Sequence, residues 1–197
     1  MILKKVYAKE KTKDIALVTD EGEFPIWEKD YEKYFSTLSI GDEIEDPDAL
    51  VTLAVRRQVK KSAVKKIAIG NITRLALIKK LCGEKVYNTF PDRADVEKIV
   101  DKLALAGFIN DASYARRFVE KCLEKSWGEY KIRASMRERG FEGQDIDTAL
   151  ENCNADWVAL ARAFAEKEED TSRESLYRKL SARGFSGEVI SCVLNGD

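Results

Sequence analysis

The sequence predicts a mainly α-helical protein, built from tandem three-helix repeats that form an elongated curved body with a small N-terminal β element. Three observations support this fold class. After residue 47, hydrophobic residues recur every three or four positions through most of the chain. A set of core positions repeats at an offset of 44 residues. Short β-prone runs separated by a turn signal fill the first 46 residues.

The N-terminal segment is expected to form a small antiparallel β element. Its β-prone runs lie at 6–8, 15–18 and 24–27, and Glu21-Gly22 is a turn signal between the last two. We expect a short helix near 31–36 and a closing turn at 41–44. Pro47 suits the first turn of a long helix, because its missing N–H would have no helical acceptor there.

From residue 47 onward we expect helices only. We place them at 49–69, 73–82, 92–106, 111–125, 129–139, 144–152, 155–168, 172–183 and 187–194. The apolar positions of the first helix are Leu50, Leu53, Ala54, Val64, Ile67 and Ala68. These elements divide the chain into a β-rich leader at 1–46 and three-helix repeats at 47–107, 108–152 and 153–197.

The repeat is clearest in the last two units. Residues 139–143, beginning Arg139-Gly140-Phe141, recur as residues 183–187, and the matched core pairs are Ile132/Leu176, Met136/Leu180, Ile146/Ile190 and Leu150/Leu194. A weaker first copy has Leu77 and Leu81 in place of Ile132 and Met136, with an intervening loop five residues longer. A unit of three short helices is too small to bury its own faces, so neighbouring units are expected to share interfaces.

The Gly-Phe pairs are typical of helix ends. Glycine adopts a left-handed conformation without strain, and the residue after it can fold back onto the last helical turn. We therefore predict that Phe141 packs on Met136. The equivalent pairs would be Phe185 on Leu180, after Gly184, and Phe108 on Leu103, after Gly107. At helix starts, Asn110-Asp111 is a predicted cap and residues 171–174 a predicted capping box.

Composition argues against several functional classes. The chain has no histidine, which removes the commonest general base and metal ligand, and it has no glycine-rich phosphate-binding motif. Its cysteines are scattered and are expected to be reduced thiols, namely Cys82, Cys122, Cys153 and Cys192. We expect no enzyme activity, cofactor or metal. Without a signal peptide or membrane-spanning segment, the expected location is the cytoplasm.

The charge is unevenly distributed. The net charge is −1, yet residues 47–90 carry +8 and 114–141 carry +4, whereas 1–46 carry −5 and 142–172 carry −7. Two interpretations stay open. The basic segments could form a face for a polyanion, or the segments could neutralise each other in the fold.

One segment of the chain has a characteristic pattern: residues 107–111 are Gly-Phe-Ile-Asn-Asp, and Tyr114-Ala115 and Phe118-Val119 follow. This pattern resembles a segment of the RecX family. Further resemblance comes from Gly128, Ile132, Met136, Arg139-Gly140-Phe141, Ile146 and Ala149-Leu150. The resemblance is strong over 94–152, weaker to the C-terminus, and limited to a general pattern in the first repeat. Two departures, a long loop with Phe90-Pro91 and no Gly-Phe cap after Leu81, leave the orientation of the first repeat open.

The resemblance implies a function. RecX proteins are regulators built from three-helix repeats that bind the RecA–DNA filament and usually restrain its recombinase and ATPase activities in recombination and DNA repair. They have no catalytic site of their own. We accordingly expect a monomer whose partner is the RecA filament, with contacts to DNA phosphates and none to membranes.

The candidate partner-binding residues are basic. They are Lys65, Lys66, Lys79, Lys80, Arg116, Arg117, Lys121, Lys131, Arg133 and Arg137. They could meet DNA phosphates or an acidic rim of RecA, or they could be ordinary solvated charge. We expect Trp127, Tyr130 and Trp157 to pack in the core or between repeats. The alternative function is a stand-alone nucleic-acid-binding protein, although the basic residues spread over several helices rather than one recognition helix.

Overall fold

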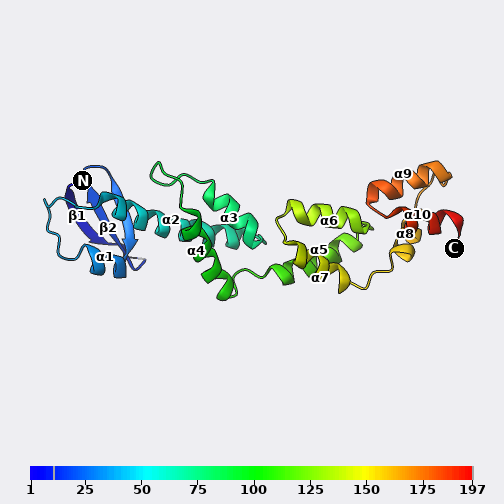
Figure 1. Cartoon of the computed structure of the whole chain (residues 1–197), viewed down its shortest axis with the longest axis horizontal. Coiled ribbons are helices and arrows are strands. Elements are labelled where there is room, and N and C mark those ends of the chain that lie inside the picture. Colours follow the sequence, from blue (N-terminus) through cyan, green and yellow to red (C-terminus); the bar gives the residue numbers. More distant parts are fainter. Residues whose placement is uncertain (11, 197) are drawn as a thin grey trace. The chain divides into compact units, whose positions relative to one another are not determined.

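The computed structural model describes residues 1–10 and 12–196, which form three strands followed by ten helices (Figure 1). Lys11 and Asp197, which fall in the predicted leader and third repeat, lie outside the described residues. The mainly α fold class is confirmed. The chain divides into two compact units. Unit 1 comprises residues 1–70 and 77–106, and unit 2 comprises residues 71–76 and 107–197.

Unit 1 begins with a three-stranded antiparallel sheet. The strands are β1 (Leu3–Ala8), β2 (Asp14–Thr19) and β3 (Glu23–Trp27), in the order β1-β2-β3. In this register Leu17 lies opposite Val6 on one side and Phe24 on the other. The predicted β element is therefore confirmed. Helix α1 (Glu28–Tyr34) starts three residues earlier than expected, with acidic residues in its first turn, where they favour a helix start.

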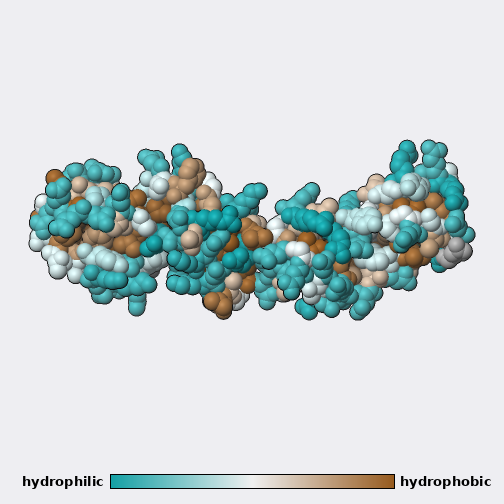
Figure 2. Space-filling model, viewed as in Figure 1, coloured by the Kyte–Doolittle hydropathy of each residue, from teal (hydrophilic) through white to brown (hydrophobic). Residues whose placement is uncertain are grey.

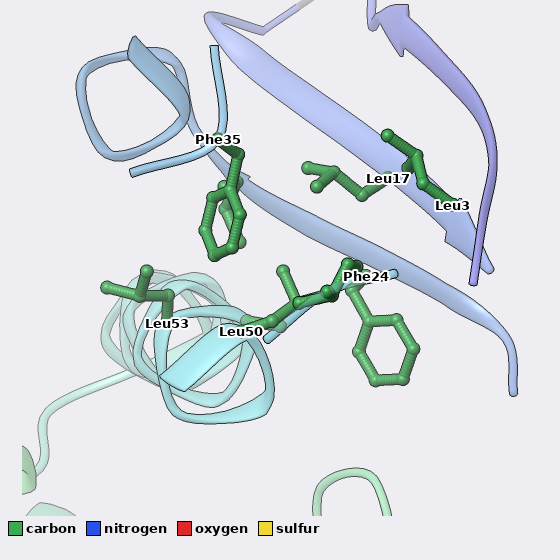
Figure 3. Packing of buried hydrophobic residues seen from close by; sticks show 9 residues of the cluster. Leu3, Leu17, Phe24, Phe35, Leu50 and Leu53 are labelled. Carbon is green, nitrogen blue, oxygen red and sulfur yellow. The ribbon is translucent and has the colours of Figure 1, made fainter. Parts of the chain in front are cut away.

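Helix α2 (Pro47–Ile69) packs on this sheet. Its N-cap is Asp46, whose carboxylate accepts a hydrogen bond from the backbone N–H of Ala49 at 2.9 Å. The shared core consists of Leu3, Leu17, Phe24, Ile26, Phe35, Ile44, Leu50, Leu53 and Ala54 (Figure 3). Beneath it, the Arg57 guanidinium on α2 forms a buried ion pair with Asp14 of β2.

The C-terminal half of α2 differs from our expectation. Its last buried positions are Val59 and Ala63, whereas Val64 and Ala68 are exposed and Ile67 is half-buried. Periodicity alone could not fix which face turns inward, because this part of the helix is apolar on more than one side. Unit 1 is completed by the main part of α3 (Arg74–Cys82) and by α4 (Arg93–Leu105), whose buried residues are Leu77, Ile78, Leu81, Val96, Val100 and Leu103.

Unit 2 contains two three-helix groups. The first consists of α5 (Asp111–Leu123), α6 (Glu129–Glu138) and α7 (Gly143–Glu151), packed around Ile132, Met136 and Ile146. The second consists of α8 (Trp157–Ala165), α9 (Arg173–Arg183) and α10 (Gly187–Asn195), packed around Leu180 and Ile190. Of the core pairs predicted from the 44-residue offset, Met136/Leu180 and Ile146/Ile190 are buried in both groups, and Leu150/Leu194 lies in or against both cores. The predicted pair Ile132/Leu176 is wrong in its second member, because Leu176 is only half-buried and Ser175 is buried beside it.

Two of the three predicted Gly-Phe corners are confirmed. Gly140 and Gly184 are left-handed, at φ 79° and 84°. The N–H of Phe141 donates to the carbonyl of Met136 at 3.1 Å, and that of Phe185 to Leu180 at 3.2 Å; both phenylalanines are buried. Gly107 is also left-handed, but Phe108 is 64% exposed and Ile109 is buried, so the predicted packing of Phe108 is wrong. A left-handed glycine ends a helix without deciding which following side chain turns inward.

The two predicted caps have different outcomes. Asn110 caps α5 as predicted, because its side chain accepts from the N–H of Ser113 at 2.8 Å. The capping box at residues 171–174 is absent, since Ser172 makes no side-chain cap bond. Instead, the Asp170 carboxylate accepts from the N–H of Ser172 at 3.0 Å, a local turn that competes with the box.

Hydrophilic residues dominate the visible face of the protein, with hydrophobic residues in smaller patches between them (Figure 2). Among the helices of residues 1–10 and 12–196, none combines the length and apolar character needed to cross a lipid bilayer.

Candidate interaction surface at the repeat junctions

The Gly140 corner of α6 fits against the start of α3. The Thr73 hydroxyl donates to the carbonyl of Arg139 at 2.9 Å. A Cβ on Gly140 would lie 3.0 Å from that hydroxyl and 3.2 Å from the backbone nitrogen of Ala76. The Asp111 carboxylate accepts from the backbone N–H of Arg74 at 3.0 Å. We call this contact the first junction.

The Gly184 corner of α9 fits against the start of α6 in the same way. The N–H of Gly128 donates to the carbonyl of Arg183 at 2.8 Å, and that of Tyr130 donates to Gly184 at 3.0 Å. A Cβ on Gly184 would overlap the backbone of Lys131, and a Cβ on Gly128 would overlap Gly184 itself. This second junction therefore requires glycine on both sides.

The two junctions obey one rule. In each, the carbonyl end of one helix meets the amide end of another, so that opposite ends of two helix dipoles face each other. The repeat alignment that pairs Leu77 with Ile132 also pairs Thr73 with Gly128, and Gly140 pairs with Gly184. The sequence repeat is thus matched, within unit 2, by a repeated contact of a glycine corner with the start of another helix.

Each junction carries an arginine stacked on a phenylalanine. The Arg139 guanidinium carbon lies 4.6 Å from the ring centroid of Phe118, and that of Arg183 lies 4.5 Å from Phe164. Such stacking fixes a cation without neutralising it. In the sequence these arginines are predicted only as part of the helix-end motif. Their equivalence at the 44-residue offset was the signal that could have marked them as site residues.

Of the predicted cations of α5, Arg117 lies at the first junction. Arg117 donates to Asn71 at 3.4 Å and to the carbonyl of Ser113 at 3.2 Å. Since Asn71 precedes Thr73 by two residues, Arg117 and Arg139 both contact the 71–73 segment. Arg116 and Lys121 are exposed, and Arg116 makes a long 3.9 Å contact with Glu120.

A second basic group surrounds Trp127 at the second junction. The Lys131 ammonium lies 4.8 Å from the ring centroid of Trp127 and donates to the carbonyl of Ala182 at 3.4 Å. The Lys125 ammonium lies 6.0 Å from the same ring. Arg183 donates to the carbonyl of Lys125 at 2.7 Å, which joins the three cations into one group. Lys131 was predicted, whereas Lys125 and Arg183 were not.

Arg133 and Arg137 were expected to act together, but their surroundings differ. Arg133 pairs with Glu129 at 2.7 Å and also with Asp147, and these carboxylates raise its pKa. Its side chain is only 26% exposed. Arg137 is exposed on the last turn of α6. Arg137 is therefore the better candidate for contact with a partner.

The predicted lysines of unit 1 form a separate set. Lys65, Lys79 and Lys80 are exposed. Lys66 pairs with Glu84 at 2.5 Å, and this contact lowers the pKa of the Glu84 carboxyl. Lys66 is accordingly part of the local structure of unit 1.

The aromatic residues follow the expectation with one exception. Trp127 and Trp157 are half-buried, and Trp157 packs against the cores of both three-helix groups of unit 2. Tyr130 is 60% exposed, so its predicted packing is wrong. Tyr130 is instead an exposed residue of the first turn of α6, one position before Lys131.

Comparison with known proteins shows which family shares this architecture. A family model described as the second three-helix domain of RecX matches residues 110–150, the segment that holds α5, α6 and α7. A regulatory protein RecX from Pseudomonas entomophila is 30% identical over 145 residues, covering 70% of this chain and 90% of the relative. The chain belongs to the RecX family. A second RecX protein, from Halorhodospira halophila, is 28% identical over 135 residues, covering 65% of this chain and 84% of that protein.

Solved RecX structures share the fold. A crystal structure of a regulatory protein RecX matches with a TM-score of 0.70 at 22% identity, and the match covers 98% of both chains. The crystal structure of RecX from Lactobacillus salivarius matches with a TM-score of 0.61 at 19% identity, covering 72% of this chain and 96% of that one. The resemblance predicted from the sequence is thereby confirmed.

Proposed function

We propose that this member of the RecX family binds the RecA–DNA filament in the cytoplasm and restrains its recombinase and ATPase activities. The observation that carries the proposal is the recurrence of a stacked, basic corner at successive repeat junctions. A filament presents the same surface at regular intervals, and a repeat protein with recurring contacts suits such a partner. The function is binding and regulation, without a catalytic site or cofactor of its own.

The binding surface consists of cations held at or near the junctions. It comprises Arg116, Arg117, Lys121, Arg137 and Arg139 around the first junction, and Lys125, Lys131 and Arg183 around the second. These groups would contact DNA phosphates or acidic side chains of the filament. Lys65, Lys79 and Lys80 form a separate exposed basic set on unit 1, whereas Arg133 and Lys66 are held in local ion pairs.

The direct test is the ATPase activity of RecA on single-stranded DNA, titrated with this protein. A ligand that blocks filament growth or spans neighbouring subunits acts below one molecule per RecA subunit. We expect inhibition at a ratio well under unity. No change in ATPase rate at equimolar protein would refute the proposal.

A second candidate function, binding of free single-stranded nucleic acid, is favoured by one observation. Exposed Tyr130 directly precedes Lys131, whose ammonium lies over the Trp127 ring, and aromatic rings among cations are typical of base-stacking surfaces. Fluorescence anisotropy with bare and RecA-coated single-stranded DNA at moderate salt separates the two functions. The filament proposal requires tighter binding to the coated DNA.

A further inference from the structure

Unit 1 contains an open groove that the proposed function does not use. The groove has a volume of about 520 Å³ and lies between the end of α1, residues 35–38 and the first turns of α2. Its apolar lining includes Phe35, Leu38, Ile44 and Leu53. Figure 3 shows Phe35 and Leu53 at one edge of the core cluster. Tyr34 also lines the groove and is 54% exposed, so an apolar surface is accessible at its mouth.

A second hollow adjoins the first on α2. Thr52 and Arg56 line both, and the second hollow, of about 320 Å³, extends to Phe90, Pro91 and the start of α4. Phe90 is 57% exposed. The two hollows are thus joined along α2 by the polar side chains of Thr52 and Arg56, with an apolar lining on either side, and together they suit a peptide segment better than a single small molecule.

Acidic groups surround this surface. Glu45 and Asp46 line one end of the groove. At the other end Arg56 pairs with Asp95 at 2.6 Å, and its pKa is raised by that contact and further by the nearby charges of Asp30 and Asp92.

The nearby cations are fewer than these carboxylates. Arg56 is already paired, and Lys33 lies over the ring of Tyr34 at 4.7 Å. Glu45 is exposed, and within the described part of the chain it forms no salt bridge. The field at the rim is consequently negative and favours a positively charged ligand.

We propose that this groove is a docking site for a basic amphipathic segment of a protein partner. Large apolar side chains of the segment enter the groove between Phe35 and Leu53, and lysine or arginine side chains face Glu45 and Asp46. An amphipathic helix can do both, because residues spaced three and four apart share one face. Acidic and apolar lining together select against nucleic acid, membrane phosphates and acidic peptides.

The test uses a fluorescein-labelled peptide of leucine and lysine, about 18 residues long, with leucines spaced to form one helical face. Anisotropy is measured with the full chain at low and moderate salt. Two control peptides are needed. One has the same composition in a scrambled order, and the other has glutamate in place of lysine. We expect the patterned basic peptide to bind best, with affinity that falls as salt rises.

Matched variants locate the binding. Glu45→Lys reverses a rim charge, and Glu21→Lys makes the same change in the exposed turn before β3. Thr52→Arg fills the groove, and Thr148→Arg makes the same change on an exposed position of α7. We expect Glu45→Lys and Thr52→Arg each to weaken peptide binding by about tenfold and the two controls by less than about twofold.

Several outcomes would overturn the proposal. Equal weakening by Glu45→Lys and Glu21→Lys would show attraction by net charge alone. Equal binding of the scrambled peptide would show that the groove does not recognise an apolar helix face. Circular dichroism of each variant identifies a folding defect, and the Glu45/Glu21 pair decides the matter if Thr52→Arg does not fold.

Discussion

The second junction predicts that Gly184 is intolerant of any side chain. In Gly184→Ala the new Cβ overlaps the backbone of Lys131, and φ of 84° adds a strain of about 1–2 kcal/mol for an L-residue. Relief of the overlap must separate α9 from α6. That separation breaks the hydrogen bonds donated by Gly128 and Tyr130, worth about 1 kcal/mol each. The expected loss is about 3–4 kcal/mol, a large part of the free energy of unfolding of a typical domain.

Two control glycines distinguish the cost of backbone strain at positive φ from the cost of steric overlap by the new Cβ. Gly107 is left-handed at φ 80°, and a Cβ there would meet nothing within 4 Å, so Gly107→Ala should cost only the strain, about 1–2 kcal/mol. Gly187 begins α10 with equally open space, and Gly187→Ala should be neutral or stabilising by about 0.5 kcal/mol. Urea unfolding by circular dichroism ranks the three variants.

Hydrogen exchange then localises the effect. The N–H groups of Gly128 and Tyr130 should lose protection in Gly184→Ala, because their acceptors lie at that corner. If Gly184→Ala costs no more than Gly107→Ala and leaves these amides protected, the junction does not hold the two helix groups together, and the reasoning fails.

The remaining predictions concern a buried ion pair, a helix cap and a basic side chain. Asp14→Asn should destabilise the protein by about 3 kcal/mol at pH 7, because it leaves buried Arg57 unpaired. Arg57 lowers the pKa of Asp14, so this contribution is complete above the unfolded value of about 3.9 and is lost as pH falls through the lower folded pKa. Urea midpoints of the two proteins should therefore converge at low pH, and a constant difference down to pH 2 would contradict this. Asn110→Ala should cost about 1 kcal/mol in urea unfolding, whereas Ser172→Ala should cost almost nothing, since only Asn110 makes a side-chain cap bond; equal losses would argue against the caps described. Arg137→Glu should leave the melting temperature nearly unchanged and weaken filament binding most at low salt, because its exposed guanidinium belongs to the proposed surface; a weakening that is the same at every salt concentration would exclude an electrostatic role.

Local rules predicted most of the fold. Alternating and helical periodicities gave the three strands and the ten helices within a few residues, although α1 has no buried residue and the end of α2 is apolar on more than one side. The glycine corners at 140 and 184 followed from one backbone rule, that glycine tolerates a left-handed conformation. The predicted burial of Val64 and Phe108 was wrong, because burial depends on which neighbouring element covers a side chain.

The candidate site was harder to predict because it depends on contacts between repeats. Charge counting proposed Arg133 and Lys66, which the structure pairs with carboxylates 14 and 18 residues away along the chain. Charge counting did not propose Arg139 and Arg183, because their stacking on phenylalanine is visible only in the folded structure. Comparison of equivalent positions at the 44-residue offset could have found them, since both precede a corner glycine.

The central claim is that cations at the repeat junctions bind the RecA–DNA filament. Its most direct test is co-sedimentation with RecA filaments on single-stranded DNA across a salt series, using wild type, Lys121→Glu with Arg137→Glu, and the control Lys4→Glu with Lys13→Glu. All four positions are exposed, and both pairs change the net charge equally. We predict that the junction pair weakens binding by about tenfold at low salt and flattens the salt dependence, while the control pair follows wild type. Superimposable curves for the two pairs, or no binding by wild type, would contradict the account.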